Sequence, residues 1–207
     1  MIVNDISYYL PETVLTNDQL DSEHPDWSIH RAAVRTGVLS RRIAKKDETA
    51  LDLSIQACQK LFSDHPELRN KIDAVVCCTQ SPDYIMPPNS VILQKTFELR
   101  ENLFAFDFNL ACSGYIYGLE MIRGLLKAKT AANILFFTAD TYSKYISYED
   151  RATATLFGDG AAVSWISATP EVSNPLFTEV IASEFYTDGY NYDKFMIPAG
   201  GCRTPKD

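Results

Sequence analysis

Short apolar runs alternate with amphipathic segments along most of this chain, and this alternation limits the folds open to it. The runs expected to form strands are Ile2 to Leu10, Ile72 to Thr79, Leu103 to Leu110, Asn133 to Ala139, Ala161 to Ser167 and Thr178 to Phe185. Strands that alternate with helices of ten or more residues indicate βαβ units. The expected fold class is therefore α/β, with a mostly parallel sheet and helices on both faces.

Capping residues and hydrophobic spacing locate the helices between these strands. The segments expected to be helical start at Asn17, span about Asp26 to Arg35 before Gly37, begin after Thr49, begin after Asn89, and run from Cys112 to about Ala128. After Thr49, the recurrence of Leu53, Ala57 and Leu61 marks one buried helix face. The polar, turn-rich segment from Ala199 to Asp207 is expected to be a loop.

Length and charge exclude several classes of protein. A chain of 207 residues, 46% of them hydrophobic, can form one domain with a substantial core. A formal net charge of −8 argues against a general nucleic-acid binder. The sequence has neither an apolar stretch long enough to span a membrane nor the order of a signal peptide, so a cytoplasmic protein is expected. Its five cysteines include no Cys-x-x-Cys pair, which suggests neither a disulfide framework nor a metal site.

Cys112 occupies the position best suited to chemistry. It lies where the apolar run ending at Leu110 gives way to a helix, so its thiol is expected at a helix N-terminus. Free backbone N–H groups and the helix dipole stabilise a thiolate there. Gly114 and Gly118 leave room for a close neighbour or a substrate. The alternative is a small buried residue at a tight turn.

A local basic cluster stands out from the acidic average. It comprises Arg31, Arg35, Arg41, Arg42, Lys45 and Lys46. Such a cluster could bind a phosphate or an acidic protein partner, or it could be an ordinary solvated surface.

Four segments together resemble β-ketoacyl-acyl carrier protein synthase III, an initiating condensing enzyme of the thiolase-fold superfamily. They are Arg35-Thr36-Gly37-Val38 with Arg42-Ile43-Ala44, Asp107 to Gly114, Asp150-Arg151-Ala152-Thr153, and Phe157 to Ala161. Asp188-Gly189 followed by Phe195-Met196-Ile197-Pro198 resembles a fifth landmark of that family. The resemblance covers nearly the whole chain, in matching order and spacing.

This resemblance implies one half of a two-fold pseudo-symmetric αβαβα fold. Residues 1–170 would form the thiolase-like half with the nucleophile, and residues 171–207 a strand and loop leading toward a C-terminal half. The implied activity is fatty-acid or polyketide initiation. Cys112 would take an acyl group from acyl-CoA and condense it with malonyl-acyl carrier protein, so the CoA thioester is a substrate and no cofactor is expected. A homodimer is also implied.

The resemblance assigns substrate contacts to several residues. Arg35 and Arg151 would hold the adenine and phosphates of CoA, with ordinary ion pairs as the alternative. Relatives commonly place a tryptophan just before the Arg-Thr-Gly segment, where this chain has Arg31, with Trp27 further back. Either Arg31 stacks on the adenine or Trp27 does, and the alternative for Trp27 is the core. Met86 would cross a dimer interface to close the partner's acyl pocket, or else pack locally.

Other residues of these motifs are expected to have structural roles and not catalytic ones. Phe157 to Gly160 reads as a tight turn between strands, and Asp107 and Asp159 read as hydrogen-bonding core carboxylates. The three histidines, His24, His30 and His65, are expected to be surface or capping residues.

The family's mechanism also requires a histidine and an asparagine from the second half, and neither is present in this chain. Truncation of a longer enzyme is therefore expected. A natural half-length protein, acting as a noncatalytic partner subunit or acyl acceptor, is the main alternative. Within the same fold, a hydroxymethylglutaryl-CoA synthase-like enzyme or a polyketide-starter synthase remains open.

Overall fold

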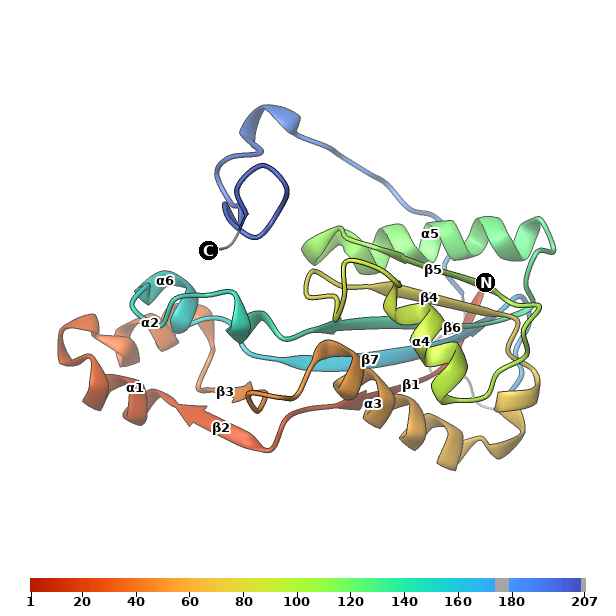
Figure 1. Ribbon diagram of the computed structural model, residues 1–207, viewed down its shortest axis with the longest axis horizontal. Coiled ribbons are helices and arrows are strands. Elements are labelled where there is room, and N and C mark those ends of the chain that lie inside the picture. The colour runs from red at the N-terminus through yellow and green to blue at the C-terminus, as the bar shows by residue number, and fades with distance from the viewer. Residues whose placement is uncertain (174–178, 206–207) are drawn as a thin grey trace.

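A five-stranded sheet forms the centre of the molecule (Figure 1). The computed structural model describes residues 1–173 and 179–205. The strands, in spatial order, are β1 (Ile2–Tyr9), β7 (Gly160–Ser167), β6 (Asn133–Asp140), β4 (Ala74–Cys78) and β5 (Phe104–Phe108). β4 pairs in parallel with both β5 and β6, whereas β7 is antiparallel to both β6 and β1. Since only β7 runs against the others, the sheet is mostly parallel, as predicted.

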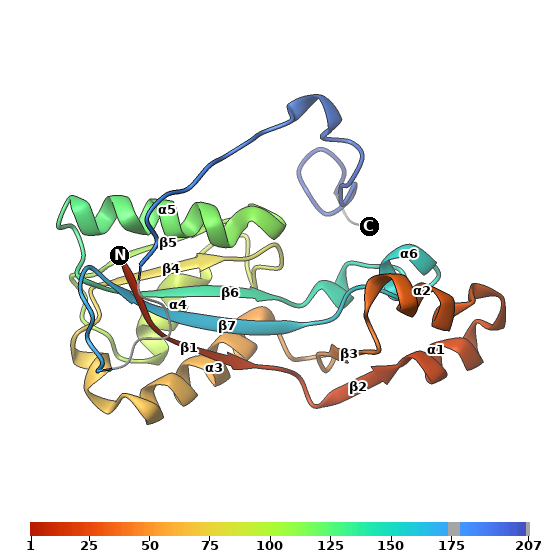
Figure 2. The same ribbon diagram turned by 180° about the vertical axis from the view of Figure 1, so that it is seen from behind.

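Helices cover both faces of this sheet. α3 (Ala50–Asp64) and α4 (Asn89–Thr96) lie on one face, and α5 (Gly114–Lys127) lies on the other (Figures 1 and 2). Side chains alternate along β6, so Phe137 joins the core under α3 while Phe136 joins the core under α5. Burial of such side chains stabilises the fold by about 1.5–3 kcal/mol each.

Local interactions define where these helices begin. Thr49 caps α3 as predicted, in a capping box with Asp52. The predicted cap of α4 by Asn89 is wrong, because Pro88 is the N-cap and Asn89 is already helical. The carboxylate of Asp107 instead accepts the backbone N–H groups of Asn89 and Ser90, at 2.6 and 2.9 Å. The carboxylate of Asp107, from β5, therefore accepts the backbone N–H groups at this helix end, which have no partner within the helix.

Two glycines allow α5 to approach the sheet closely. A Cβ atom added at Gly118 would overlap the ring of Phe136, and one added at Gly114 would overlap Sγ of Cys78. The room that these glycines leave is therefore taken by a neighbouring part of the protein.

A smaller unit projects beyond one end of the sheet (Figure 1). It contains the antiparallel strands β2 (Thr13–Thr16) and β3 (Ser40–Ile43) with the helices α1 (Asn17–Glu23), α2 (Ile29–Thr36) and α6 (Arg151–Ala154). Neither β2 nor β3 was predicted as a strand, because both are short and β3 is rich in arginine. Leu20, Trp27, Ile29 and Ala154 form the core of this unit.

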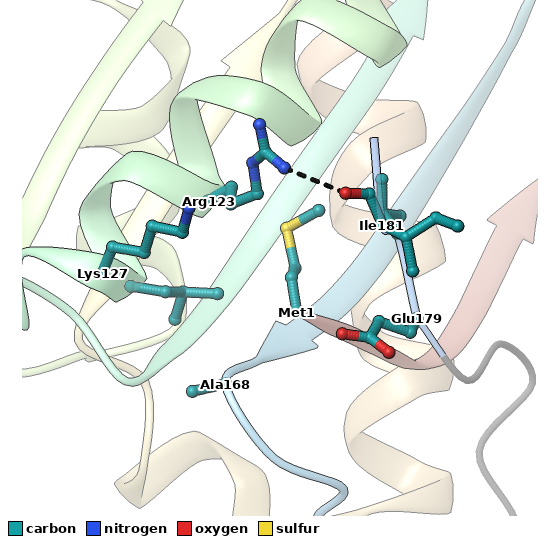
Figure 3. Close-up of a pocket in the computed structure, with 8 residues that line it drawn as sticks. Met1, Arg123, Lys127, Ala168, Glu179 and Ile181 are labelled. Carbon is teal, nitrogen blue, oxygen red and sulfur yellow. Dashed lines mark hydrogen bonds between the residues drawn. The ribbon is translucent and has the colours of Figure 1, made fainter. Parts of the chain in front are cut away.

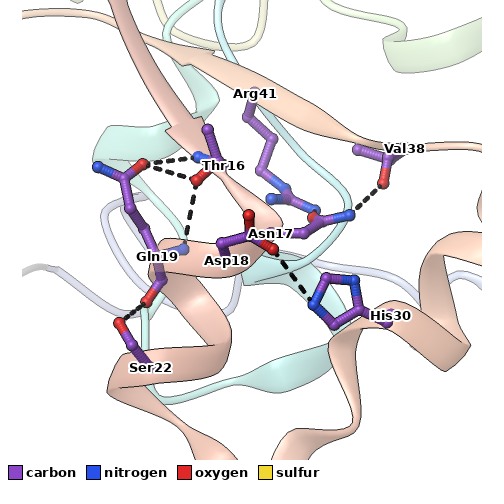
Figure 4. A network of polar contacts seen from close by, with 8 residues as sticks. All are labelled: Thr16, Asn17, Asp18, Gln19, Ser22, His30, Val38 and Arg41. Atoms are coloured by element: carbon purple, nitrogen blue, oxygen red, sulfur yellow. Dashed lines mark hydrogen bonds and ion pairs between the residues drawn. The ribbon is translucent and has the colours of Figure 1, made fainter.

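Buried Arg41 ties β3 to the rest of the projecting unit. Its guanidinium donates to Oδ1 of Asn17 at 2.7 Å and, through Nε, to the carbonyl of Thr155 at 2.9 Å. Figure 4 shows the surrounding network, in which the Asn17 amide donates to the carbonyl of Val38 at 3.0 Å. Desolvation on burial lowers the pKa of Arg41. Arg41, one member of the predicted basic cluster, is therefore a buried structural residue and is not available to bind a ligand at the surface.

The remaining elements are single turns of 3₁₀ helix. They are Pro25–Trp27, Pro66–Asn70, Ala111–Ser113, Tyr142–Lys144 and Gly189–Asn191. The helix predicted from about Asp26 to Arg35 is broken, because Ser28 adopts a left-handed conformation with φ 51° between the first of these turns and α2. Gly37, with φ 74°, ends α2 as predicted.

Residues 179–187 run beside α5 (Figures 1 and 2), where Val180 packs into the core under α5 and its backbone N–H donates to the carbonyl of Met1 at 3.3 Å. The strand predicted from Thr178 to Phe185 is wrong for residues 179–185, which pair with no strand, while Thr178 lies outside the described residues. Isolated contacts hold this segment instead, such as the packing of Phe185 against Tyr117, with ring centroids 4.6 Å apart. Within residues 1–173 and 179–205, no helix is long and apolar enough to cross a membrane.

Candidate active site

The turn between β5 and α5 exposes Cys112. After β5, the 3₁₀ turn Ala111–Ser113 leads directly into α5, which begins at Gly114. Ala111 has φ 49°, in the left-handed region that residues with a Cβ rarely adopt. This conformation turns the chain sharply at the carboxyl end of the strand. Cys112 is consequently an exposed cysteine at the start of a 14-residue helix, as the sequence predicted, and it is not buried in a tight turn.

Cys112 lines a pocket of about 240 Å³ at the carboxyl ends of β4 and β6. Polar groups come from Gln80 and Asp140, which follow or end those strands. Phe157 and Phe195 supply apolar rings, with centroids 6.2 Å apart. A thiol flanked by both kinds of surface is suited to a small ligand with a polar head and an apolar tail.

Asp140 organises one wall of this pocket. Its Oδ1 accepts the backbone N–H groups of Gln80 and Ser81, at 2.6 and 3.1 Å, and the hydroxyl groups of Thr79 and Ser81, at 3.2 and 3.1 Å. Burial raises the pKa of Asp140, and these hydrogen bonds oppose the increase. Burial also raises the pKa of Tyr142, with smaller contributions from Asp140 and Cys112.

Asp159 connects three segments near the pocket. Its carboxylate accepts the backbone N–H groups of Ala44 and Ser143, at 2.7 and 2.9 Å, and the hydroxyl group of Ser143. Asp159 and Asp107 are thus hydrogen-bonding carboxylates, as predicted. The turn from Phe157 to Gly160 joins α6 to β7, so the prediction of a turn between two strands is wrong. A Cβ atom at Gly158 would lie 2.9 Å from the carbonyl oxygen of Arg42, so only glycine fits this approach.

Burial distinguishes the cysteines from one another. Cys58, Cys77 and Cys78 are buried, whereas Cys112 and Cys202 are exposed. Desolvation raises the pKa of Cys58 and Cys77, and it raises the pKa of Cys78 to about 11. These buried thiols are therefore poor nucleophiles near neutral pH.

The three arginines assigned to CoA all lie on the projecting unit. Arg31 and Arg35 are exposed on α2, and Arg151 is exposed on α6. α2 and α6 lie side by side in both overall views (Figures 1 and 2), and Ile29 of α2 and Ala154 of α6 belong to the same buried cluster. None of the three arginines forms an ion pair with another described residue, so the predicted alternative of ordinary ion pairs is not observed. Their substrate role stays a prediction.

Trp27 belongs to the core of the projecting unit. It is 9% exposed, packs with Leu20 and Ile29, and stacks on His24 with ring centroids 3.8 Å apart. Such a ring cannot stack on an adenine without rearrangement, so the core alternative for Trp27 is correct. Arg31 remains the exposed candidate for that contact.

Met86 projects into solvent from the loop between β4 and α4. It is 82% exposed, and the neighbouring Ile85 is fully exposed. Local packing, the alternative considered for Met86, is therefore not observed. Met86 also does not line the pocket of its own chain around Cys112.

The histidines make local contacts away from Cys112. Nε2 of His65 lies 2.7 Å from Oδ2 of Asp5, and Nε2 of His30 lies 3.3 Å from Oδ1 of Asp18. His24 and His65 are the C-cap residues of α1 and α3. These are capping or surface positions, as predicted. Among the described residues, no group of three or more histidine, cysteine or acidic side chains could hold a metal ion.

A larger pocket, of about 440 Å³, lies at the other end of α5 (Figure 3). Arg123 and Lys127 of α5 line it together with Met1, Glu179 and Ile181. Arg123 donates to the carbonyl of Ile181 at 3.4 Å. In the part of the chain that the structure describes, no cysteine, serine or histidine lines this pocket, so its size does not make it a better candidate for covalent chemistry.

Sequence reasoning missed four residues of the Cys112 pocket. They are Gln80, Asp140, Tyr142 and Phe195. The sequence could have indicated Gln80 and Asp140, since each is a polar residue directly after a predicted strand, where ligands bind in this class of sheet. No local signal brings Phe195 to Cys112, because that contact depends on the path of the chain over α5.

Comparisons with known proteins point to a single family. The model of the family described as 3-oxoacyl-[acyl-carrier-protein (ACP)] synthase III matches residues 106–189. A β-ketoacyl-[acyl-carrier-protein] synthase III of Chlamydia caviae is 34% identical over 95% of this chain and 57% of its own length. The corresponding protein of Sulfurimonas denitrificans is 35% identical over 98% of this chain and 59% of its own length.

Solved structures agree with the sequence comparisons. A crystal structure of 3-oxoacyl-(acyl-carrier-protein) synthase III has a TM-score of 0.90 and 40% identity, covering all of this chain and 60% of that one. The enzyme of the same name from Pseudomonas aeruginosa PAO1 has a TM-score of 0.85 and 32% identity, covering 99% of this chain and 62% of its own. The chain thus spans somewhat more than half the length of these relatives.

Proposed function

Because this chain belongs to the β-ketoacyl-acyl carrier protein synthase III family over the part that it spans, we propose that Cys112 takes an acyl group from an acyl-CoA. The architecture is one half of the thiolase-like α/β fold. The observation that carries the proposal is the exposed thiol at the start of α5, in a pocket with apolar rings on one side and polar groups on the other. The whole protein would then initiate fatty-acid or polyketide synthesis.

The loading step is an exchange between thioesters. The Cys112 thiolate attacks the carbonyl carbon of the acyl-CoA, a new carbon–sulfur bond forms, and the bond to the CoA sulfur breaks. CoA leaves as a thiolate and takes up the proton that Cys112 lost. The backbone N–H of Cys112 would stabilise the oxyanion of the intermediate, at the positive end of α5.

The condensation step would use malonyl-acyl carrier protein. Loss of carbon dioxide leaves a carbanion on the malonyl-derived group, and that carbanion attacks the acyl carbon held by Cys112. A carbon–carbon bond forms, the bond to sulfur breaks, and the Cys112 thiolate is restored. Residues 1–170 would carry the nucleophile, and residues 171–207 would lead toward the part of the family's fold that supplies the histidine and asparagine.

The projecting unit would hold the CoA moiety. Arg35 and Arg151 offer permanently charged, planar groups for its phosphates, and exposed Arg31 could stack on the adenine. The adjacent placement of α2 and α6 supports a shared role for these arginines. The exposed Met86 loop supports a homodimer in which that side chain enters the partner's pocket.

Intact-mass spectrometry tests the proposal. The protein is incubated with acetyl-CoA and with longer acyl-CoAs, and the variants Cys112→Ser and Cys202→Ser are treated in parallel. We expect one acyl adduct that persists in Cys202→Ser and disappears in Cys112→Ser. No adduct on the folded protein would favour a noncatalytic partner subunit. An adduct retained by Cys112→Ser would assign the acyl acceptor elsewhere.

A further inference from the structure

Among the described residues that line the pocket around Cys112, one has an acidic side chain, namely Asp140. Of the residues that line it, Gln80, Ala111, Phe157, Gly158 and Phe195 are uncharged, and burial keeps the Tyr142 phenol neutral by raising its pKa. The two other lining residues are Cys112 itself and Asp140, which supplies a carboxyl group. Any group that enters this pocket therefore meets a carboxyl group, in a setting less polar than water.

The hydrogen bonds of Asp140 favour its ionised form. Four donors converge on one oxygen, Oδ1, and the shortest of them is the Gln80 N–H at 2.6 Å. A carboxylate is an acceptor only, so this arrangement suits the anion. The Ser81 hydroxyl in turn accepts the backbone N–H of Thr141 at 2.9 Å, which fixes the cluster between the ends of β4 and β6. The charge is therefore held at a fixed place in the pocket wall.

A fixed negative charge repels anionic groups and leaves neutral ones unaffected. Resting on the function proposed above, we propose that Asp140 is a specificity-determining residue that excludes carboxylate-bearing acyl groups from Cys112. Cys112 then accepts neutral acyl groups and not malonyl groups, and the malonyl-derived group attacks in the second step only after its carboxylate has left as carbon dioxide. Sorting is needed because both substrates are thioesters, and a thiolate can attack either of them.

Alkylation measures the charge effect without requiring acyl transfer. Iodoacetamide is neutral and iodoacetate is anionic, and the two reagents are similar in size and attack the same sulfur. The ratio of the iodoacetate rate to the iodoacetamide rate is measured at Cys112 and at exposed Cys202 by peptide mass spectrometry. In the wild-type protein, we expect the ratio at Cys112 to be at least fivefold below that at Cys202. Equal ratios would overturn the proposal, and this measurement needs no substitution.

Two matched variants assign the effect to Asp140. Asp140→Asn keeps an oxygen that accepts the same hydrogen bonds but removes the charge. Asp107→Asn makes the same chemical change in a carboxylate that also accepts two backbone N–H groups but lines a different pocket. We expect the ratio at Cys112 to rise about tenfold in Asp140→Asn, since one unit charge is removed from the wall of the same pocket, and to stay unchanged in Asp107→Asn. An unchanged ratio in folded Asp140→Asn would contradict the proposal.

Acyl thioesters extend the test to the proposed reaction. Acetyl-CoA and malonyl-CoA are offered separately, and adducts on Cys112 are measured by intact mass. We expect acetyl adducts in both proteins and a malonyl adduct only in Asp140→Asn. A malonyl adduct on the wild-type protein would overturn the selectivity. If acetyl-CoA gives no adduct, the proposed function fails, and the alkylation ratios still decide the role of Asp140.

Discussion

The chemistry proposed for Cys112 depends on single residues that the fold places around it. Ala111, in a left-handed conformation, turns the chain so that the next side chain is exposed. Asp140, at the end of β6, lines the same pocket as the Cys112 thiol. The positive φ of Ala111 is not visible in the local sequence, because it arises from tertiary packing. The position of Asp140 at the carboxyl end of a predicted strand is visible there, but its place in the same pocket as Cys112 depends on how the strand ends come together.

Cysteine reactivity gives a first test at this scale. Under native conditions near neutral pH, we expect iodoacetamide to label Cys112 and Cys202 and to spare the three buried cysteines. Burial raises the pKa of those three thiols, so they contain little thiolate. Cys112 should react faster than Cys202, since only Cys112 lies at a helix N-terminus. Peptide mapping with time checks this order, and unfolding in urea, which should expose all five cysteines, is the control.

The buried carboxyl group of Asp140 predicts a pH dependence of stability. Its folded-state pKa is raised above the usual value of 3.8, mainly by desolvation. Between the usual and the raised value, the folded protein binds more protons than the unfolded chain. The contribution of Asp140 to the free energy of unfolding therefore increases as the pH falls through this window.

Comparison with Asp140→Asn isolates this contribution from the other acidic groups. The free energy of unfolding is measured by urea titration from neutral pH to about pH 4. We expect the wild-type value minus the variant value to become more positive as the pH falls. A difference that becomes more negative would mean that the hydrogen bonds to Asp140 outweigh its desolvation.

At the scale of elements, the sequence predicted the parts of the fold that have strong local patterns. The five strands of the main sheet, the Thr49 cap and the end of α2 at Gly37 are all correct. β2 and β3 were missed because their few residues lack an apolar pattern and are stabilised by each other and by buried Arg41. Residues 179–185 read as a strand, yet they run beside α5 without joining either sheet.

Two glycines of α5 provide a matched test of helix packing. We expect Gly118→Ala to destabilise the protein by about 1–3 kcal/mol, because the added methyl group would overlap the ring of Phe136. Gly124→Ala lies on the same helix with nothing near its added Cβ, so it should stabilise the protein by about 0.5–1 kcal/mol. Urea unfolding of both variants gives the two free energies. A stabilising Gly118→Ala would show that α5 can move away from the sheet without cost.

At the scale of the whole molecule, an uncovered apolar surface extends from the edge of the sheet to the loop before α4. β5 is an edge strand, and Phe104 on it is 44% exposed. Tyr84 and Ile85 line a pocket with Phe108, at the end of that strand, and Met86 follows them in the same loop. Exposed edge strands and clustered apolar side chains favour association with another chain. This surface therefore supports the proposed homodimer.

Sedimentation velocity over micromolar concentrations tests the dimer with a matched pair of variants. Met86→Asp should shift the protein toward monomer by at least tenfold in dissociation constant, because a charge would have to be buried at the interface. Val34→Asp introduces the same charge at an apolar residue that is 87% exposed, on α2 and away from this surface, so it should leave the dimer unchanged. A wild-type protein that stays monomeric, or a dimer weakened equally by both variants, would contradict an interface at Met86. A dimer weakened by Met86→Asp alone would mean that the loop before α4 serves assembly, and the pocket of one Cys112 would then depend on a second copy of the chain.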